Sequence, residues 1–177
     1  IAIIDDQRFP AVHDLLPLYN IIHLRDVFSI NNIAEYKIIL CDLNNVGSNI
    51  HHVSHGAFVI EQIRDRYPTT YVIAYSSDDT SDRARIARQF AHRFIPKTIT
   101  STSWRVEVDS AIKSIHDPVW IWTQIKEQLN ANGVSPRQVA ALENQFVRRI
   151  IRGDDRLAAY LKNYTPETKA LVSNIFA

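Results

Sequence analysis

Short apolar runs recur along the first hundred residues, and most of them are rich in β-branched or aromatic side chains. They lie at residues 1–4, 21–24, 38–41, 71–75 and 94–95. Apolar runs of this length between polar segments are typical of buried strands. The pattern therefore predicts five strands.

Helical patterns alternate with these runs. They cover residues 10–19, 31–36, 57–66 and 82–91, with only a weak signal in the second. A fifth follows the last strand and carries its apolar residues on one face: Trp104, Val108, Ala111, Ile112 and Ile115. The alternation predicts an α/β fold, a doubly wound five-stranded parallel sheet.

The pattern changes at Asp117-Pro118, after which no stretch looks like a strand. Apolar residues at helical spacing predict one helix around Ile125 and a second through Val139, Leu142, Phe146 and Ile150. Shorter helical segments are expected at 157–161 and 168–175. We therefore predict two units, residues 1–116 and an all-helical region at 117–177.

Composition limits where the protein can work and which partners it can have. The single cysteine, Cys41, excludes an internal disulfide framework, and no apolar stretch approaches the roughly 18 residues of a membrane span. The start of the chain lacks a secretory pattern, so we expect a cytoplasmic protein without a membrane partner. The net charge of +1 gives no global electrostatic reason to expect nucleic acid. The chain has no Met, even at position 1, which is compatible with a fragment of a longer protein.

Polar residues with useful chemistry follow the predicted strands. Asp5 and Asp6 end the first strand, Asp42 the third and Ser76 the fourth, and Lys97 follows the fifth. The carboxyl ends of parallel strands meet at one edge of the sheet, where ligands bind. We expect these five side chains to converge there.

Such a site suits phosphoryl transfer to an aspartate. Three close carboxylates repel one another, and their hard oxygen atoms favour Mg²⁺ as the compensating cation. A divalent ion can bridge an acceptor carboxylate and an incoming phosphoryl group. Lys97 would add a second positive charge, and Ser76 a hydroxyl donor.

The strings that carry these residues resemble the CheY-like receiver family of response regulators. They are IAIIDD, YKIILCDLN, YVIAYSS and RFIPK, in the family's order. The resemblance covers residues 1 to about 115 and implies the flavodoxin-like receiver fold. It also implies a phosphoryl acceptor rather than an enzyme, with a sensor histidine kinase or a phosphotransfer protein as the donor.

The resemblance assigns a role to each residue. Asp42 would be phosphorylated, Ser76 and Lys97 would contact the phosphoryl group, and Phe94 would be the switch aromatic. The Mg²⁺ ligands would be Asp5, Asp6, Asp42 and the backbone carbonyl of Asn44.

The loop after Asp42, LNNVGSNIHHVSHG, departs from the family because it is expanded, and Thr98 stands where the family has Pro. His51 and His55 are spaced to share one helical face, so the loop is either a solvated insertion containing His51, His52 and His55 or part of a transition-metal site with a further ligand. Cys41 is either a redox group or, as strand alternation favours, a small buried residue.

The helical region resembles the helix-turn-helix output domain of the LuxR and NarL family. SPRQVAALENQFVRRIIRG resembles its opening helix, and LAAYLKNYTPETKALVSNIF resembles its scaffold helix, turn and recognition helix. The resemblance implies DNA binding. Lys169 is the only cation of that last helix, so phosphate contacts would come from Arg148, Arg149, Arg152, Arg156 and Lys162.

A plain helical bundle is the alternative, in which the stripe from Val139 to Ile150 is core or a homodimer contact. Trp120 and Trp122 are then expected to pack the bundle against the receiver's fifth helix.

The leading hypothesis is a two-component response regulator that relays phosphorylation of Asp42 through residues 117–177, with DNA as the output partner. The alternatives are a receiver-like adaptor without regulated phosphorylation and a phosphatase. The latter rests on CDLNN, which loosely resembles the nucleophile motif of haloacid dehalogenase-like enzymes but has Asn44 where that family has an acid.

Overall fold

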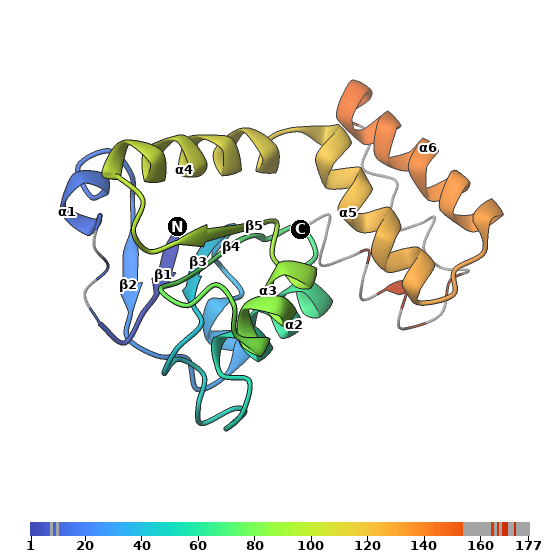
Figure 1. Ribbon diagram of the computed structural model, residues 1–177. Coiled ribbons are helices and arrows are strands. Elements are labelled where there is room, and N and C mark those ends of the chain that lie inside the picture. Colours follow the sequence, from blue (N-terminus) through green and yellow to red (C-terminus); the bar gives the residue numbers. More distant parts are fainter. Residues whose placement is uncertain are drawn as a thin grey trace.

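A computed structural model describes residues 1–7, 9, 11–153, 164, 166, 168, 169 and 172. In this part of the chain, five parallel strands form one sheet in the order β2-β1-β3-β4-β5. They are β1 (Ala2–Ile4), β2 (Ile22–Leu24), β3 (Ile38–Asp42), β4 (Tyr71–Ser76) and β5 (Arg93–Pro96). The predicted doubly wound parallel sheet is confirmed (Figure 1).

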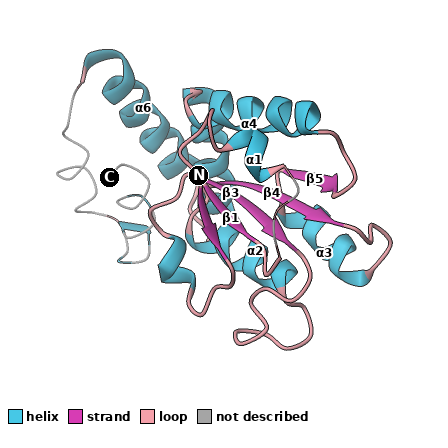
Figure 2. Ribbon diagram, turned by 90° about the vertical axis from the view of Figure 1, so that its left-hand side faces the viewer, coloured by secondary structure: helices cyan, strands magenta, loops and turns pink. Residues whose placement is uncertain are grey.

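Helices cover both faces of the sheet (Figure 2). On one face lie α2 (Gly56–Arg66), α3 (Asp82–Phe90) and the 3₁₀ helix η1 (Ile30–Ile33). On the other lie α1 (Val12–Leu15) and α4 (Ser101–Ile115). Every residue of β3 and β4 is buried, which explains why both strands read as continuous apolar runs.

The first two helices are shorter than predicted. The helix expected at 10–19 is the four-residue α1, and the one expected at 31–36 is a single 3₁₀ turn. Pro17 follows α1 closely, and a proline removes a helical hydrogen bond and disfavours helical backbone in the residue before it. The apolar residues of this segment still reach the core, where Leu15 is fully buried.

Cys41 lies in the core beneath α2 and is fully buried, as strand alternation predicted. Burial, with the nearby charge of Asp42, raises the pKa of its thiol well above the ordinary value. A neutral buried thiol is unreactive, so a redox role has no support.

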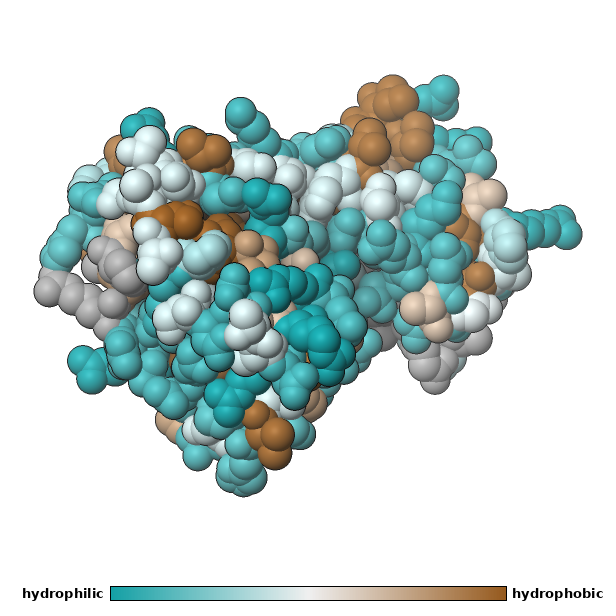
Figure 3. Space-filling model, in the orientation of Figure 1, coloured by the Kyte–Doolittle hydropathy of each residue, from teal (hydrophilic) through white to brown (hydrophobic). Residues whose placement is uncertain are grey.

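Two further helices form an antiparallel pair, α5 (Pro118–Ala131) and α6 (Pro136–Arg152), seen beyond α4 in Figure 1. Asp117 caps α5, and Ser135 with Gln138 forms a capping box at α6. Their shared core contains Trp122, Ile125, Leu129, Val139, Leu142 and Phe146. Three members of the predicted α6 stripe lie in this core, whereas Ile150 is 53% exposed, and with Val147 and Ile151 it contributes apolar surface near the end of α6 (Figure 3). A homodimer contact of Ile150 stays a prediction.

The α5–α6 pair meets the α/β part of the chain through α5 at the amino-terminal edge of the sheet. The Trp120 ring lies 5.6 Å from the ring of Tyr71 and 5.2 Å from that of His92. Trp122 instead turns into the α5–α6 core and packs on Phe146. The expectation that both tryptophans pack against the helix after the fifth strand, α4, is therefore wrong for Trp122, and the ring partners of Trp120 are Tyr71 and His92, which lie outside α4.

The predicted segment 157–161 and most of 168–175 lie outside the described residues, as do Arg156 and Lys162. The turn and recognition helix of the helix-turn-helix hypothesis therefore stay a prediction. In the described part of the chain, no helix combines the length and apolar character needed to cross a membrane.

Candidate functional site

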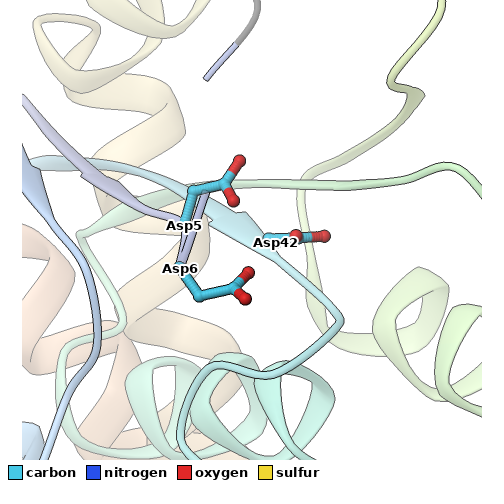
Figure 4. A group of neighbouring side chains, drawn as sticks. All are labelled: Asp5, Asp6 and Asp42. Atoms are coloured by element: carbon cyan, nitrogen blue, oxygen red, sulfur yellow. The ribbon is translucent and has the colours of Figure 1, made fainter. Parts of the chain in front are cut away.

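The acidic residues meet at the point where the strand order reverses. β1 and β3 are neighbours at the centre of the sheet, Asp5 and Asp6 follow β1, and Asp42 is the last residue of β3. One carboxylate oxygen from each of the three lies within 4.8 Å of the others. Figure 4 shows the three side chains extending to the same side. Sequence order alone predicted this convergence because parallel strands share their carboxyl edge.

Lys97 reaches the cluster from the end of β5. Its Nζ donates to Asp42 Oδ2 at 2.6 Å and lies 3.4 Å from Asp5 Oδ2. The register is fixed next to it, where the Lys97 N–H donates to the carbonyl of Ser76 on β4. The lysine therefore offsets part of the charge of two aspartates.

Asp5 is fully buried and held by further donors. The Tyr75 hydroxyl donates to its Oδ2 at 2.9 Å, and the backbone N–H of Gln7 donates to its Oδ1 at 3.0 Å. Tyr75 was missed by the sequence interpretation, which read it only as an apolar strand residue. The strand pattern gave no signal for this contact, because the β3–β4 register that sets Tyr75 opposite Asp42 is fixed only in the structure.

Burial dominates the electrostatics of Asp42. It raises the pKa of Asp42, and the charge of Asp5 acts in the same direction, while Lys97 opposes both. Burial lowers the pKa of Lys97, but the hydrogen bond and charge of Asp42, with those of Asp5, outweigh it and raise the pKa overall. A cation beside these carboxylates is thus favoured, and Lys97 keeps its proton.

The donor set fits a hard divalent cation. Asp6 Oδ2 accepts a hydrogen bond from Asn45 Nδ2 at 3.1 Å, whereas Asp6 Oδ1 is buried and has no hydrogen-bond partner among the described residues. A buried carboxylate oxygen without a donor is costly unless a cation or water satisfies it. Together, the carboxylates of Asp5, Asp6 and Asp42 provide the oxygen ligands that Mg²⁺ prefers.

Ser76 and Asn44 are near the cluster in the chain: Ser76 follows Tyr75, which pairs with Asp42, and Asn44 lies two residues after Asp42. Ser76 is buried at the end of β4, and its Oγ accepts from the backbone N–H of Asp78 at 3.1 Å. The Asn44 side chain follows Asp42 and accepts from Arg83 at 3.3 Å. Phe94 on β5 is half-buried, with the guanidinium of Arg88 lying 4.1 Å from its ring centroid.

The start of α2 requires glycine. A Cβ on Gly56 would lie 2.0 Å from the carbonyl oxygen of Asp42 and 2.9 Å from Leu43 Cα. Both contacts are with backbone, which cannot move aside cheaply. Gly56 thus allows the expanded loop to return close to the backbone of Asp42.

The loop histidines differ in their contacts, and His55 Nδ1 is buried without a hydrogen-bond partner among the described residues. His51 Nδ1 accepts from the backbone N–H of Ser54 at 3.0 Å, and its ring stacks on Phe58. Within the described residues, Asp5, Asp6 and Asp42 are the only group of three potential ligands that lie close enough to hold a metal ion. The transition-metal interpretation of His51 and His55 has no third ligand there.

Comparison with solved structures identifies the fold. A CheY-like response-regulator receiver protein from Methanospirillum hungatei aligns with a TM-score of 0.51 and 13% identity, covering 64% of this chain and 93% of its own. A response regulator from Thermotoga maritima gives 0.50 and 20%, covering 63% and 95%. A beryllofluoride-activated DrrB receiver domain gives 0.50 and 12%, also covering 63% and 95%. The chain has the receiver fold.

The likeness is one of fold, because the identities are low. No family model and no curated protein matches the sequence. The aligned receiver structures leave more than a third of this chain uncovered. The acidic cluster and its lysine nevertheless occupy the edge of the sheet where the order of the strands directs ligand binding.

Proposed function

We propose that this receiver-fold protein is a two-component response regulator in which Asp42 accepts a phosphoryl group from a sensor histidine kinase or a phosphotransfer protein. The observation that carries the proposal is the cluster of Asp5, Asp6 and Asp42 with Lys97 at 2.6 Å from Asp42. Such a cluster combines an acceptor carboxylate, ligands for a divalent ion and a fixed positive charge. A receiver accepts one phosphoryl group per chain and transmits the event, so no turnover is expected.

Each residue has a distinct task in the proposal. Asp5, Asp6, Asp42 and the backbone carbonyl of Asn44 would hold Mg²⁺, which neutralises charge on the phosphoryl oxygens when bound. An Asp42 carboxylate oxygen forms the new bond to phosphorus as the bond to the donor's leaving group breaks. Lys97 stays protonated and balances the added charge, and Ser76 donates its hydroxyl to a phosphoryl oxygen.

The test is labelling by acetyl phosphate with Mg²⁺ present. We expect one phosphoryl group on the wild type and none on Asp42→Asn, measured by intact mass and by phosphate release in mild base. Asp65→Asn removes an exposed carboxylate of α2 and should label normally. Undiminished labelling of Asp42→Asn would exclude Asp42. A wild type that neither labels nor changes its amide spectrum with beryllofluoride and Mg²⁺ would favour the adaptor alternative.

The relay to the helical region would run through the receiver's contacts with α5. Gln124 Oε1 on α5 accepts from Arg64 NH1 of α2 at 2.8 Å and lies 3.1 Å from His92 Nε2. His92 directly precedes β5, and Lys97 directly follows it. One short strand therefore connects the acceptor site with the attachment point of the helical region, which supports a role for residues 117–177 as the output.

We further propose DNA as the output partner. The support is the resemblance of the helical region and the exposed basic residues Arg148 and Arg152 near the end of α6. Both would contact phosphates, so binding to a duplex should weaken as salt rises. Replacing both with Gln should reduce the slope of log K against log salt by about 2. An unchanged slope would exclude this face.

A further inference from the structure

The loop after Asp42 is clamped to α3 by one arginine. Arg83 Nε donates to the backbone carbonyl of Val53 at 3.0 Å, and Arg83 NH1 donates to the side-chain oxygen of Asn44 at 3.3 Å. Val53 lies near the end of the expanded loop and Asn44 near its start. One rigid guanidinium therefore spans the loop at two points.

Other contacts fix the near side of the loop. The Gly47 N–H donates to Asp26 Oδ1 at 2.6 Å, and Asn45 Nδ2 donates to Asp6 Oδ2. Gly47 and Asn45 both have positive φ, so the chain turns sharply here. Arg83 attaches the far side, so the loop is held between the acidic cluster and α3.

The position of Arg83 is not explained by its own helix. It occupies the first turn of α3, next to the positive end of the helix dipole, where a cation is unfavourable. Arg85, two residues further along α3, instead pairs with Asp82 of the same helix. The tertiary contacts of Arg83 with the loop are what offset its unfavourable location.

We propose that Arg83 is a positioning residue for the divalent-ion site, acting through Asn44. This inference rests on the proposed function, in which the Asn44 backbone carbonyl is a Mg²⁺ ligand. Holding the Asn44 side chain and the loop end against α3 fixes the backbone that presents this carbonyl. Residues that orient metal ligands in this way typically change metal affinity by a factor of ten or more when they are removed.

Mg²⁺ titration of the full chain tests the proposal, with calorimetry giving the apparent Kd. We expect Arg83→Gln to raise this Kd roughly tenfold. Arg83→Lys keeps the positive charge but lacks a guanidinium that can donate to two acceptors at once, so it should raise the Kd by a smaller factor. Arg85→Gln is the matched control on the same helix and should bind as the wild type does. Amide spectra of each variant verify that the fold is retained.

A double-mutant cycle with Asn44→Ala identifies the route. If Arg83 acts through Asn44, the two losses are not additive, and Arg83→Gln changes little once Asn44 is truncated. Wild-type affinity in Arg83→Gln, full retention in Arg83→Lys, or additive losses would each overturn the clamp. In those cases the wild type still binds Mg²⁺ and labels on Asp42, so the proposed function stands. A wild type that binds no Mg²⁺ overturns the inference together with the proposed function.

Discussion

His92 should make the protein acid-sensitive through the junction between the receiver and α5. Its Nδ1 accepts the backbone N–H of Val72 at 2.9 Å, so the neutral ring carries its proton on Nε2 and donates to Gln124. Arg64 NH1 lies 2.9 Å from the same Nε2, and its hydrogen bonds go to Gln124 Oε1 and the Pro68 carbonyl. A second proton on the ring would face the Val72 N–H and add charge beside Arg64.

The structure sets the sign and size of this effect. Burial, together with the charge of Arg64, lowers the pKa of His92 from its ordinary 6.5 to about 4. Between these values the unfolded chain binds a proton that the folded chain does not. The stability that the neutral His92 contributes is therefore fully present above pH 6.5 and is lost as the pH falls toward 4. At about 1.4 kcal/mol per pKa unit, the full loss is roughly 3 kcal/mol, of which about 2 kcal/mol is gone by pH 5.

Urea unfolding at pH 7 and pH 5 measures the loss. His92→Asn keeps an acceptor for Val72 and cannot charge, so its free energy of unfolding should fall about 2 kcal/mol less than that of the wild type. His52→Asn removes an exposed loop imidazole and should retain the wild-type fall. Equal falls for the wild type and His92→Asn would refute the reasoning, because the burial of His92 would then have no effect on proton binding.

Two further predictions concern the acidic cluster around Asp42. Gly56→Ala should lower the free energy of unfolding by about 2–4 kcal/mol, because its Cβ would lie 2.0 Å from the Asp42 carbonyl oxygen. Thermal unfolding measures this loss, and a melting temperature equal to that of the wild type would contradict the close approach. Mg²⁺ at ten times its Kd should stabilise the wild type by about 1.4 kcal/mol, and Asp6→Asn should lose that gain in the same melts; equal stabilisation of both would show that Asp6 does not bind the ion.

The sequence predicted the sheet and the acidic cluster for a common reason. Strands buried on both faces must be continuously apolar, so each boundary is visible where polar residues resume. Asp5, Asp6 and Asp42 stand at two of those boundaries, and parallel pairing brings the boundaries together. Placement of these residues therefore needed only the order of the strands, not the packing of any side chain.

The features that the sequence did not reveal are side-chain pairs distant in the chain. Arg83 and Asn44 are separated by 39 residues, and Tyr75 and Asp5 by 70. Periodicity identifies which face of an element is buried, but it carries no information on which polar group a given donor will meet. Helix length failed for a related reason, because the predicted first helix kept its buried residues while most of its backbone is not helical.

The attachment of α5 illustrates this limit most directly. Its apolar spacing correctly predicted a helix with a buried face, yet Gln124 is also buried, between residues that pack on α6. A buried amide must find partners, and here they come from the receiver, with Arg64 donating at 2.8 Å and His92 at 3.1 Å. Gln128 adds a bond from its Nε2 to the Arg64 carbonyl at 3.0 Å. Apolar packing thus pairs α5 with α6, whereas the polar contacts specify where α5 docks on the receiver, and only the former has a periodic signature.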